Sequence, residues 1–412
     1  KLIMLKRSLF LVFSVLAINT LYSKVKIINY DKITNKIIVG AESINEYKPL
    51  ILSKKIGIVA NHTSVIFKST NRLLANENID YTHLVDSLLK LNIEIKKIFT
   101  PEHGYKGEKP NGANISDDID KKTGLEIISL HGKKRKYGEL SNEDLEGIDM
   151  MIFDIQDVGV RFYTHISTLH YVMKACAQNN IPLILLDRPN PNIHYVDGPI
   201  LESVNKSFVG MHNVPIVYGM TIGEYANMIN GENWLGNDLN CKLRVIKIKN
   251  YNRKSNYSLP IKPSPNLPND KSINLYPSLC LFEGTNISVG RGTNEQFTIY
   301  GSPFLDKKIY KYRFTPKPNT GSSSPKNNGL VCFGEQLSSV QNFKKIELKY
   351  LINSYNNSSN KDQFFNSFFI KLSGTKNLKD QIINNFTEKE IRASWSKGLN
   401  DFKKIRLKYL IY

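Results

Sequence analysis

Glu102 and His103 lie side by side in the segment FTPEHGYKGE, between Pro101 and Gly104. A carboxylate beside an imidazole can carry out general acid–base catalysis. A solvated loop with a capping glutamate would contain the same residue types, but this pair follows an apolar run, and open α/β sheets bind ligands beyond the ends of their strands. We therefore take Glu102 and His103 as candidate catalytic residues, whereas Glu108, further along the loop, has no assigned role.

Asp154 and Asp157 flank Gln156 at the end of another apolar run and are further catalytic candidates. Paired carboxylates suit glycoside hydrolysis, in which one carboxyl protonates the leaving oxygen and the other handles water or the sugar carbon. They would also suit a divalent cation. Asp154 could instead bind backbone amides at the end of the strand. Just beyond, Arg161 and Tyr163 could hold a carboxylate or a sugar.

The histidines raise the question of a catalytic metal. His62 and His131 could join Glu102 as ligands, which is the main argument for a metal enzyme. The sequence contains no HExxH motif, and His165 and His170 are five residues apart, which does not place them on one helix face as i, i+4 ligands require. We therefore expect no catalytic metal and no other cofactor.

These polar residues follow the predicted strands of an α/β fold. Apolar runs alternate with helical patterns, which is typical of a parallel sheet buried on both faces. The runs are IGIVA, IEIKKIFT, LEIISL, DMMIFD and IPLILL. Because the carboxyl ends of parallel strands meet at one edge, polar side chains from all five segments should gather on one rim. The substrate-binding candidates, two of them from the glycine-rich segment GTNISVGRGT, are Asn61, His62, His131, Arg161, Tyr163, Arg188, Asn190, Asn286 and Arg291.

The length of 412 residues indicates two domains, since one domain usually holds about 100 to 200 residues. Residues 1–23 combine a basic start with a short apolar run, which predicts a signal peptide and a periplasmic or secreted protein. We expect a catalytic α/β domain over residues 24–205. A smaller α+β domain over residues 206–412 would close the cleft.

Charge and cysteine content argue against several classes of protein. The net charge of +19 comes mostly from lysines spread along the chain, without a basic stripe interleaved with aromatics, so we expect no nucleic-acid partner. The four cysteines match no zinc or thioredoxin-like spacing. No segment beyond the signal is suited to stable membrane insertion. In the second domain, Thr221 and Glu224 predict a capped helix, and residues 315–329 a linker-like insertion.

Several segments together resemble one bacterial family, the NamZ-type exo-β-N-acetylmuramidases, formerly a domain of unknown function. The segments are GIVANHTS, FTPEHGYKGE, FDIQDVGVRFYTHISTL, DRPNPN, VDGPILE and SLCLFEGTNISVGRGTNEQF. The resemblance runs from about residue 50 to the terminal YLIY and is weaker after residue 300. It implies a Rossmann-like N-terminal domain with a parallel sheet, a smaller α+β C-terminal domain and an active site in the cleft between them.

The resemblance also implies a glycosidase of peptidoglycan recycling that releases N-acetylmuramic acid from the non-reducing end of peptidoglycan fragments. The family's candidate catalytic glutamate lies in its PEHG segment, which corresponds here to Glu102. We expect a raised pKa to help Glu102 act as the general acid. Arg161, Arg188 and Arg291 are candidates for binding the lactyl carboxylate of the sugar.

Some alternatives stay open at this point. The second catalytic group could be Asp154, Asp157 or the acetamido oxygen of the substrate itself. The same rim could belong to a module that binds a muropeptide or another acidic sugar without cleaving it. It could also belong to a metal-dependent hydrolase of an ester or amide. The sequence does not indicate the oligomeric state.

Overall fold

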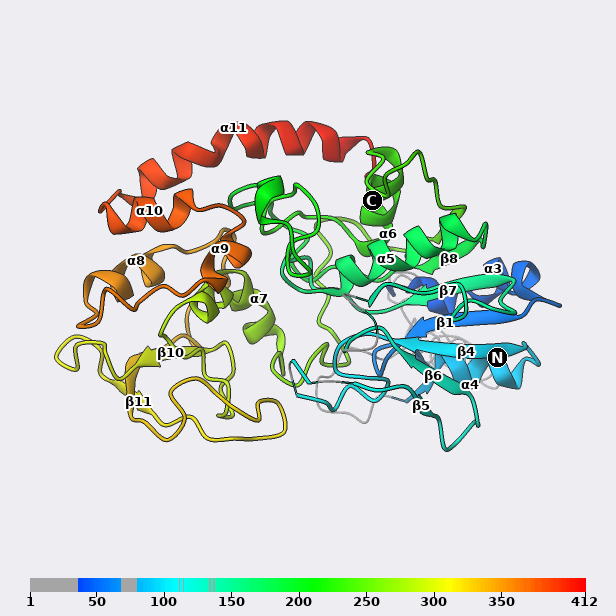
Figure 1. Ribbon diagram of the computed structural model, residues 1–412, viewed down its shortest axis with the longest axis horizontal. Helices are drawn as coiled ribbons and strands as arrows, with labels where there is room; N and C mark the ends of the chain where they lie inside the picture. Colours follow the sequence, from blue (N-terminus) through cyan, green and yellow to red (C-terminus); the bar gives the residue numbers. More distant parts are fainter. Residues whose placement is uncertain (1–35, 68–79, 111, 114, 133–134, 136–137) are drawn as a thin grey trace, which may run out of the picture. The chain divides into compact units, whose positions relative to one another are not determined.

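The five apolar runs, with β5 and β9 at the two edges, form a seven-stranded sheet that is parallel except at one edge (Figure 1). The computed structural model describes residues 36–67, 80–110, 112–113, 115–132, 135 and 138–412, so the predicted signal peptide lies outside the described residues. The strand order is β5-β6-β4-β1-β7-β8-β9, and β5 runs antiparallel to β6. In chain order the strands are β1 (Ile56–Ala60), β4 (Ile95–Thr100), β5 (Asp118–Ile119), β6 (Glu126–Ser129), β7 (Met150–Asp154), β8 (Leu183–Leu186) and β9 (Leu243–Ile246).

Helices cover both faces of this sheet. Successive side chains of a strand point to opposite faces, and those of β1, β7 and β8 enter two apolar clusters alternately. One cluster contains α3 (Ile44–Ile51) and α4 (Leu84–Lys90), and the other contains α5 (His165–Gln178) and α6 (Ile222–Gly231). The predicted cap of α6 is present as a complete capping box at Thr221. The shorter elements of this part are η1 (Gly40–Glu42), β2 (Val65–Phe67), β3 (Tyr81–His83) and η3 (Ser203–Asn205).

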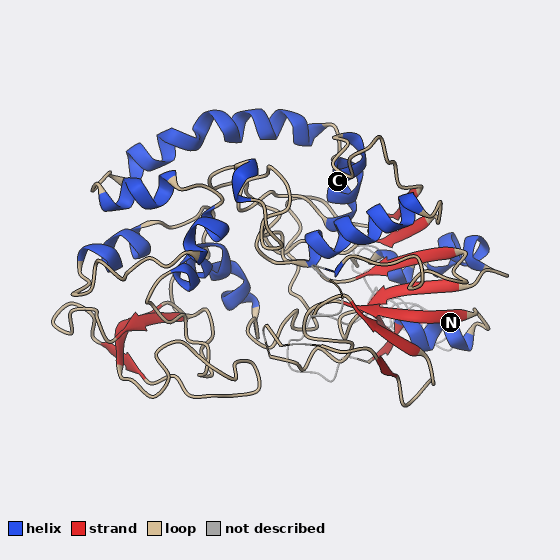
Figure 2. Cartoon of the chain, viewed as in Figure 1, coloured by secondary structure: helices blue, strands red, loops and turns tan. Residues whose placement is uncertain are grey.

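The second part of the chain combines a small antiparallel sheet, of order β10-β12-β11, with helices (Figure 2). Its side chains form a third apolar cluster, which also takes in Val158, Val160 and Phe162 from the segment after β7. That segment therefore joins the rim of the large sheet to the second part. The elements are α7 (Asp270–Leu279), η4 (Cys280–Gly284), β10 (Ile299–Ser302), β11 (Tyr312–Phe314), β12 (Cys332–Gln336), α8 (Lys349–Asn356), α9 (Phe368–Ser373), α10 (Asn377–Ile383) and α11 (Glu388–Leu407).

Helix α11 returns from the second part towards the first (Figure 1). Trp395 packs in the third cluster, whereas Phe402 packs in the cluster of α5 and α6. The chain then ends at Tyr412, whose hydroxyl donates to Asp187 at 2.8 Å and accepts from the amide of Ile248 at 2.8 Å. The last residues of the chain are thus bound to the end of strand β8.

The α/β fold class is confirmed, with a mostly parallel large sheet and a smaller part built of helices and an antiparallel sheet. Residues Ile38–Tyr412 form one compact unit. Strand β9 of the large sheet lies beyond residue 205, and the predicted domain limits stay a prediction. Within the described part of the chain, no helix has the length and apolar character to cross a membrane.

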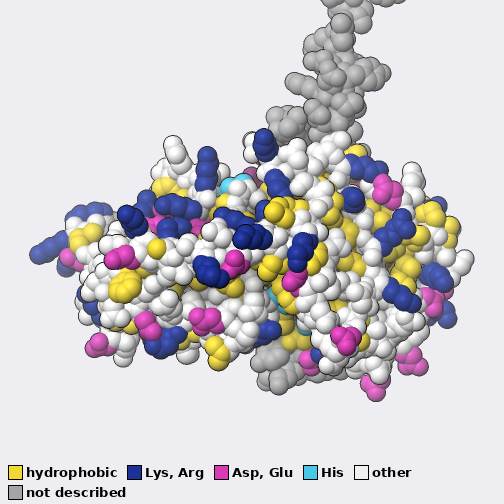
Figure 3. Space-filling view, turned by 90° about the horizontal axis from the view of Figure 1, so that it is seen from above, with side chains coloured by type: hydrophobic (Ala, Val, Ile, Leu, Met, Phe, Trp, Pro, Cys, Tyr) yellow, Lys and Arg dark blue, Asp and Glu magenta, His cyan; other side chains and the backbone are white. Residues whose placement is uncertain are grey.

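Charged side chains are dispersed over the face that carries α11. Figure 3 shows Lys and Arg side chains there interspersed with Asp and Glu, rather than gathered in one stripe. The cysteines Cys176, Cys241, Cys280 and Cys332 are all buried as free thiols. Burial raises the pKa of each of these thiols, which favours the protonated, unreactive form.

Candidate active site

The strand-end loops and the second part of the chain enclose a cavity of about 400 Å³. Its wall comes from the loop after β4, the start of α5, the loop before α7, the residues of η4 and the 315–329 loop. The predicted site residues in this wall are Glu102, His103, Tyr163 and Arg291. The other polar side chains of the wall are Thr164, His165, Ser264, Asn266, Tyr276, Glu283, Ser322, Ser324 and Lys326.

Glu102 faces the cavity without an ion pair among the described residues. Its carboxylate accepts hydrogen bonds from the amide of Gly112 at 2.9 Å and from the hydroxyl of Thr164 at 3.3 Å. Burial by itself would raise the pKa of Glu102, but His103, His131 and the Gly112 amide together bring that pKa below its ordinary value. The expectation of a raised pKa is therefore wrong for the open cavity, because the neighbouring imidazoles, the Gly112 amide and Arg291 together outweigh desolvation.

Three predicted site residues hold the proline-rich stretch 262–264. His62 Nε2 donates to the carbonyl of Lys262 at 2.8 Å, and the Tyr163 hydroxyl donates to the carbonyl of Pro263 at 2.8 Å. His103 Nδ1 donates to a carbonyl of its own loop at 2.7 Å, so its Nε2 is left to accept from the hydroxyl of Ser264 at 3.2 Å. His103 thus positions two loops of the cavity wall, and we no longer assign it the proton transfer.

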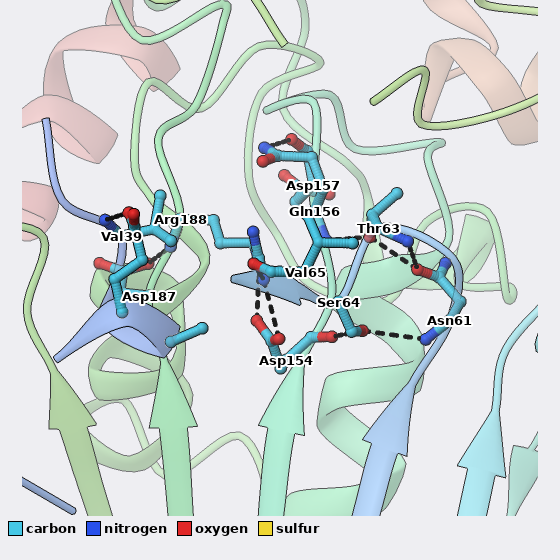
Figure 4. A network of polar contacts seen from close by, with 12 residues as sticks. Val39, Asn61, Thr63, Ser64, Val65, Asp154, Gln156, Asp157, Asp187 and Arg188 are labelled. Carbon is cyan, nitrogen blue, oxygen red and sulfur yellow. Dashed lines mark hydrogen bonds and ion pairs between the residues drawn. The ribbon is translucent and has the colours of Figure 1, made fainter. Parts of the chain in front are cut away.

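Asp154 and Arg188 form a buried ion pair at the ends of β7 and β8. Arg188 donates from Nε and Nη2 to the two carboxylate oxygens at 2.6 and 2.8 Å, and also to the carbonyl of Val65 at 3.1 Å (Figure 4). Asp154 is fully buried, Arg188 is 3% exposed, and neither lines the cavity. This pair braces the rim of the sheet, so Asp154 has a structural role, but through Arg188 and not through the backbone amides named as its structural alternative.

Asp157 is also buried outside the cavity wall. Its Oδ2 accepts from the amide of Gly159 at 2.7 Å and from the hydroxyl of Tyr218, while its Oδ1 has no partner among the described residues. Burial raises the pKa of Asp157 to about 6, although these donors lower it. Gln156, beside it in Figure 4, holds the same turn by donating to the carbonyl of Pro189 at 2.7 Å.

Arg161 is fully buried, and its terminal nitrogens are used up by backbone carbonyls. Nη1 donates to Pro199 and Val214 at 2.9 and 2.7 Å, and Nη2 donates to Leu372 and Ser373 at 2.9 and 2.7 Å. No terminal N–H is left for a substrate carboxylate, and Arg161 is absent from the cavity wall. Its contacts tie the segment after β7 to helix α9, so we no longer assign it to substrate.

The predicted asparagines bind protein groups away from the cavity. Asn61 Oδ1 accepts from a backbone amide of its own turn at 2.9 Å, and Asn190 Nδ2 donates to a backbone carbonyl at 2.8 Å. Asn286 Nδ2 donates to a backbone carbonyl at 3.4 Å. His131 also lies outside the wall, although its charge contributes to the lowered pKa of Glu102.

Arg291 is the predicted arginine that faces the cavity. Its Nε and Nη2 donate to the carboxylate of Glu283, and its guanidinium lies 5.0 Å from the ring centre of Phe297. Burial would lower the pKa of Arg291, but Glu283 raises it, so the guanidinium stays charged. Nη1 forms no hydrogen bond within the described part of the chain and is the edge available to a ligand.

Sequence reasoning missed the contribution of the 315–329 loop. Lys326 donates to the carbonyls of Phe282 and Glu283 at 3.1 Å each, and also to that of Thr285. Asn266 donates to the carbonyl of Gly321 in the same loop at 2.7 Å. The composition of this loop is that of a linker and gives no sign of a site. Its place in the cavity wall follows from its hydrogen bonds to η4 and to the proline-rich loop.

Thr164 and His165 were also missed as cavity residues. They begin helix α5 directly after the polar turn that follows β7. Their position next to the predicted rim was the available signal, but His165 was considered only as a metal ligand. Among the described residues, no three His, Cys, Asp or Glu side chains lie close enough together to hold a metal ion.

A carboxylate without an ion pair among the described residues, a fixed guanidinium and several neutral polar groups line a cavity whose size suits a small polar ligand such as a sugar. Family models described as exo-β-N-acetylmuramidase NamZ, N-terminal and C-terminal, match residues 56–271 and 274–412. The chain belongs to this NamZ family. As a member of this family, it is an enzyme that hydrolyses glycosidic bonds.

Known relatives cover nearly the whole chain. It is 36% identical over 398 residues to the peptidoglycan β-N-acetylmuramidase NamZ of Bacillus subtilis strain 168, which spans 92% of both chains. A crystal structure of a DUF1343 family protein from Bacteroides fragilis NCTC 9343 has a TM-score of 0.80 and 43% identity, and covers 91% of this chain and 99% of its own. A second such protein from the same strain has a TM-score of 0.76 and 27% identity, covering 92% and 99%.

Proposed function

We propose that this protein releases N-acetylmuramic acid from the non-reducing end of peptidoglycan fragments, with Glu102 as the general acid. The observation that carries the proposal is the position of Glu102, just after β4 in the wall of the cavity and without an ion pair to any described residue. The name of the Bacillus subtilis relative supports a peptidoglycan substrate. A role in cell-wall recycling and a periplasmic or secreted location are part of the same proposal.

In this mechanism Glu102 protonates the glycosidic oxygen as the bond to the anomeric carbon breaks. A bound sugar removes water from the cavity and so increases the burial that raises the pKa of Glu102, which opposes the lowering by the groups around the carboxylate. Asp154 is bound to Arg188 and Asp157 is buried outside the wall. We therefore assign the attack on the anomeric carbon to the acetamido oxygen of the substrate, a known exception among glycosidases.

Arg291 is our candidate for recognising the lactyl carboxylate of N-acetylmuramic acid. Glu283 fixes its guanidinium through Nε and Nη2, which leaves Nη1 for the ligand. The positive charge of Lys326 lies in the same wall and adds to the attraction for an anion. Burial lowers the pKa of Lys326 to about 8, so this amine remains mostly protonated at neutral pH.

The substitution Glu102→Gln tests the role of the general acid. It keeps the size of the side chain and its ability to accept hydrogen bonds, but it removes the proton that must be donated. We expect kcat on the disaccharide N-acetylmuramyl-β-1,4-N-acetylglucosamine, whose leaving oxygen must be protonated, to fall about 100- to 10,000-fold. Glu108→Gln is the matched control, because Glu108 lies exposed in the same loop and should retain wild-type activity. Near wild-type turnover by Glu102→Gln would refute the assignment.

A further inference from the structure

His165 is a buried group in the cavity wall that the mechanism above does not use. It is 2% exposed and is the first residue of helix α5. It follows Thr164, whose hydroxyl contacts Glu102. The imidazole therefore lines the same cavity as the candidate general acid, on the side formed by the segment after β7.

The hydrogen bond of the ring determines which nitrogen carries the proton. His165 Nδ1 lies 3.0 Å from the carbonyl oxygen of Gln156. A carbonyl only accepts, so Nδ1 is the protonated nitrogen, and Nε2 of the neutral ring has a free lone pair. This is the only hydrogen bond of the ring within the described residues, and Nε2 is not among the buried atoms without a partner. The free acceptor is therefore open to the cavity.

The surroundings hold this ring in place. Gln156 is itself fixed, since its backbone amide donates to Thr63 at 3.1 Å and its side chain donates to the carbonyl of Pro189 at 2.7 Å. The ring of Tyr163 meets that of His165 edge to face, with centres 4.6 Å apart. The position of Nε2 is thus set before a ligand enters.

The ring also stays neutral. Burial, with a smaller effect of the nearby His103, lowers the pKa of His165 to about 3, although Gln156 and Glu102 oppose the change. A group of such low basicity is a poor general base for water at neutral pH. It remains a good hydrogen-bond acceptor, and an acceptor left without a donor in a closed cavity is costly.

We propose that His165 is a specificity-determining residue whose Nε2 accepts a hydrogen bond from a hydroxyl or amide N–H of the sugar bound beside Glu102. When a buried polar group of a site needs a hydrogen bond, ligands that lack the matching donor bind much more weakly. A site that selects by shape alone discriminates far less. The inference rests on the proposed function, because it takes the bound sugar to be N-acetylmuramic acid.

Two substitutions separate the accepting role from a merely structural one. In His165→Asn, the side-chain amide can still donate to the Gln156 carbonyl, but nothing replaces Nε2. In His165→Gln, the longer side chain can place its carbonyl oxygen near the position of Nε2. His170→Asn is the control, because His170 is buried on the same helix but lies outside the cavity wall. Thermal unfolding of each variant identifies any loss of folding.

The measurement is calorimetric binding of the methyl β-glycoside of N-acetylmuramic acid and of its 4-deoxy, 6-deoxy and 2-O-acetyl analogues, each lacking one donor. In the wild type, we expect at least one analogue to bind about 10- to 100-fold more weakly than the parent. His165→Asn should bind the parent glycoside about as weakly as the wild type binds that analogue, and it should no longer discriminate between the two. His165→Gln should retain part of the discrimination, and His170→Asn all of it.

Unchanged discrimination in His165→Asn would overturn the inference. So would a wild type that binds all the analogues as tightly as the parent, and that result needs no variant to fold. A wild type that neither binds nor cleaves the parent glycoside would instead overturn the proposed function on which the inference rests. The two failures are therefore distinguishable.

Discussion

The carboxylates near the rim of the large sheet differ in what surrounds them. Asp154 is held by Arg188 through two hydrogen bonds, and Asp157 is held by Tyr218 and a backbone amide. Within the described part of the chain, Glu102 accepts from one amide and one hydroxyl, and it faces the cavity. A general acid must gain and lose its proton during turnover, which an ion pair to a buried arginine opposes. At the residue scale, this difference singles out Glu102 among the three.

Substitution of Arg291 by Lys tests recognition of the lactyl carboxylate. Lysine keeps the charge opposite Glu283 but lacks the planar fork that can bind two carboxylates at once. We expect the preference of the enzyme for an N-acetylmuramic acid glycoside over an N-acetylglucosamine glycoside to fall about tenfold, measured as the ratio of kcat/KM values. Arg313→Lys, on the exposed strand position of β11, should leave that ratio unchanged. An unchanged ratio in Arg291→Lys would exclude Arg291 from this role.

The 315–329 loop shows how an irregular segment becomes part of a site. It has no helix or strand of its own, yet Lys326 donates to the carbonyls of three η4 or adjacent residues. Its start is also tied down, since the amide of Lys317 donates to the carbonyl of Gly292 at 3.0 Å. At the scale of elements, these bonds fix Ser322 and Ser324 in the wall of the cavity.

The substitution Lys326→Met should loosen this loop. Methionine fills the space of the lysine stem but leaves the carbonyls of η4 without their donor, which costs about 1–3 kcal/mol of folding free energy. We also expect a several-fold rise in KM, because the cavity wall is less well held. Lys317→Met is the control, since this side chain is exposed in the same loop. Equal denaturant midpoints and KM values for the two variants would show that Lys326 does not fix the wall.

The elements were more predictable from the sequence than the site. Strands such as β1 and β7 follow from local apolar runs, and the α6 cap follows from Thr221 and Glu224, three residues apart. The partners that decide a side chain's role are distant in sequence. Asp154 meets Arg188 34 residues away, and Arg161 meets the carbonyl of Leu372 211 residues away. Glu102 was predicted from its motif and its strand-end position, and the structure places it in the cavity wall.

At the scale of the whole molecule, Asp187 connects the sheet to the end of the chain. This buried carboxylate accepts from the Thr221 hydroxyl at 2.7 Å, the Gly223 amide at 2.9 Å and the Tyr412 hydroxyl at 2.8 Å. Burial nevertheless raises the pKa of Asp187 from 3.8 to about 7. The folded protein therefore holds a proton that the unfolded chain releases at much lower pH. The contribution of the protonated Asp187 to the free energy of unfolding is complete below pH 3.8 and is lost as the pH rises towards 7.

The substitution Asp187→Asn should reduce this pH dependence. The amide can donate to the two hydroxyls while its oxygen still accepts from the backbone amides, so it imitates the protonated acid. One pKa unit corresponds to about 1.4 kcal/mol. Between pH 4 and pH 8, we therefore expect the free energy of unfolding to fall by roughly 2–4 kcal/mol less in the variant than in the wild type. Urea unfolding across this range measures it. Asp362→Asn, at an exposed position, should follow the wild-type curve. If Asp187→Asn also follows the wild-type curve, the raised pKa of Asp187 does not contribute to the pH dependence of stability.

The most direct test of the central claim is to incubate the full-length protein with peptidoglycan fragments and to identify the products by mass spectrometry. One set of fragments should carry N-acetylmuramic acid at the non-reducing end, and the other N-acetylglucosamine. We predict free N-acetylmuramic acid from the first set only, with the remaining fragment shortened by that one sugar. Cleavage within the glycan chain, or no product from the first set, would contradict the proposed function.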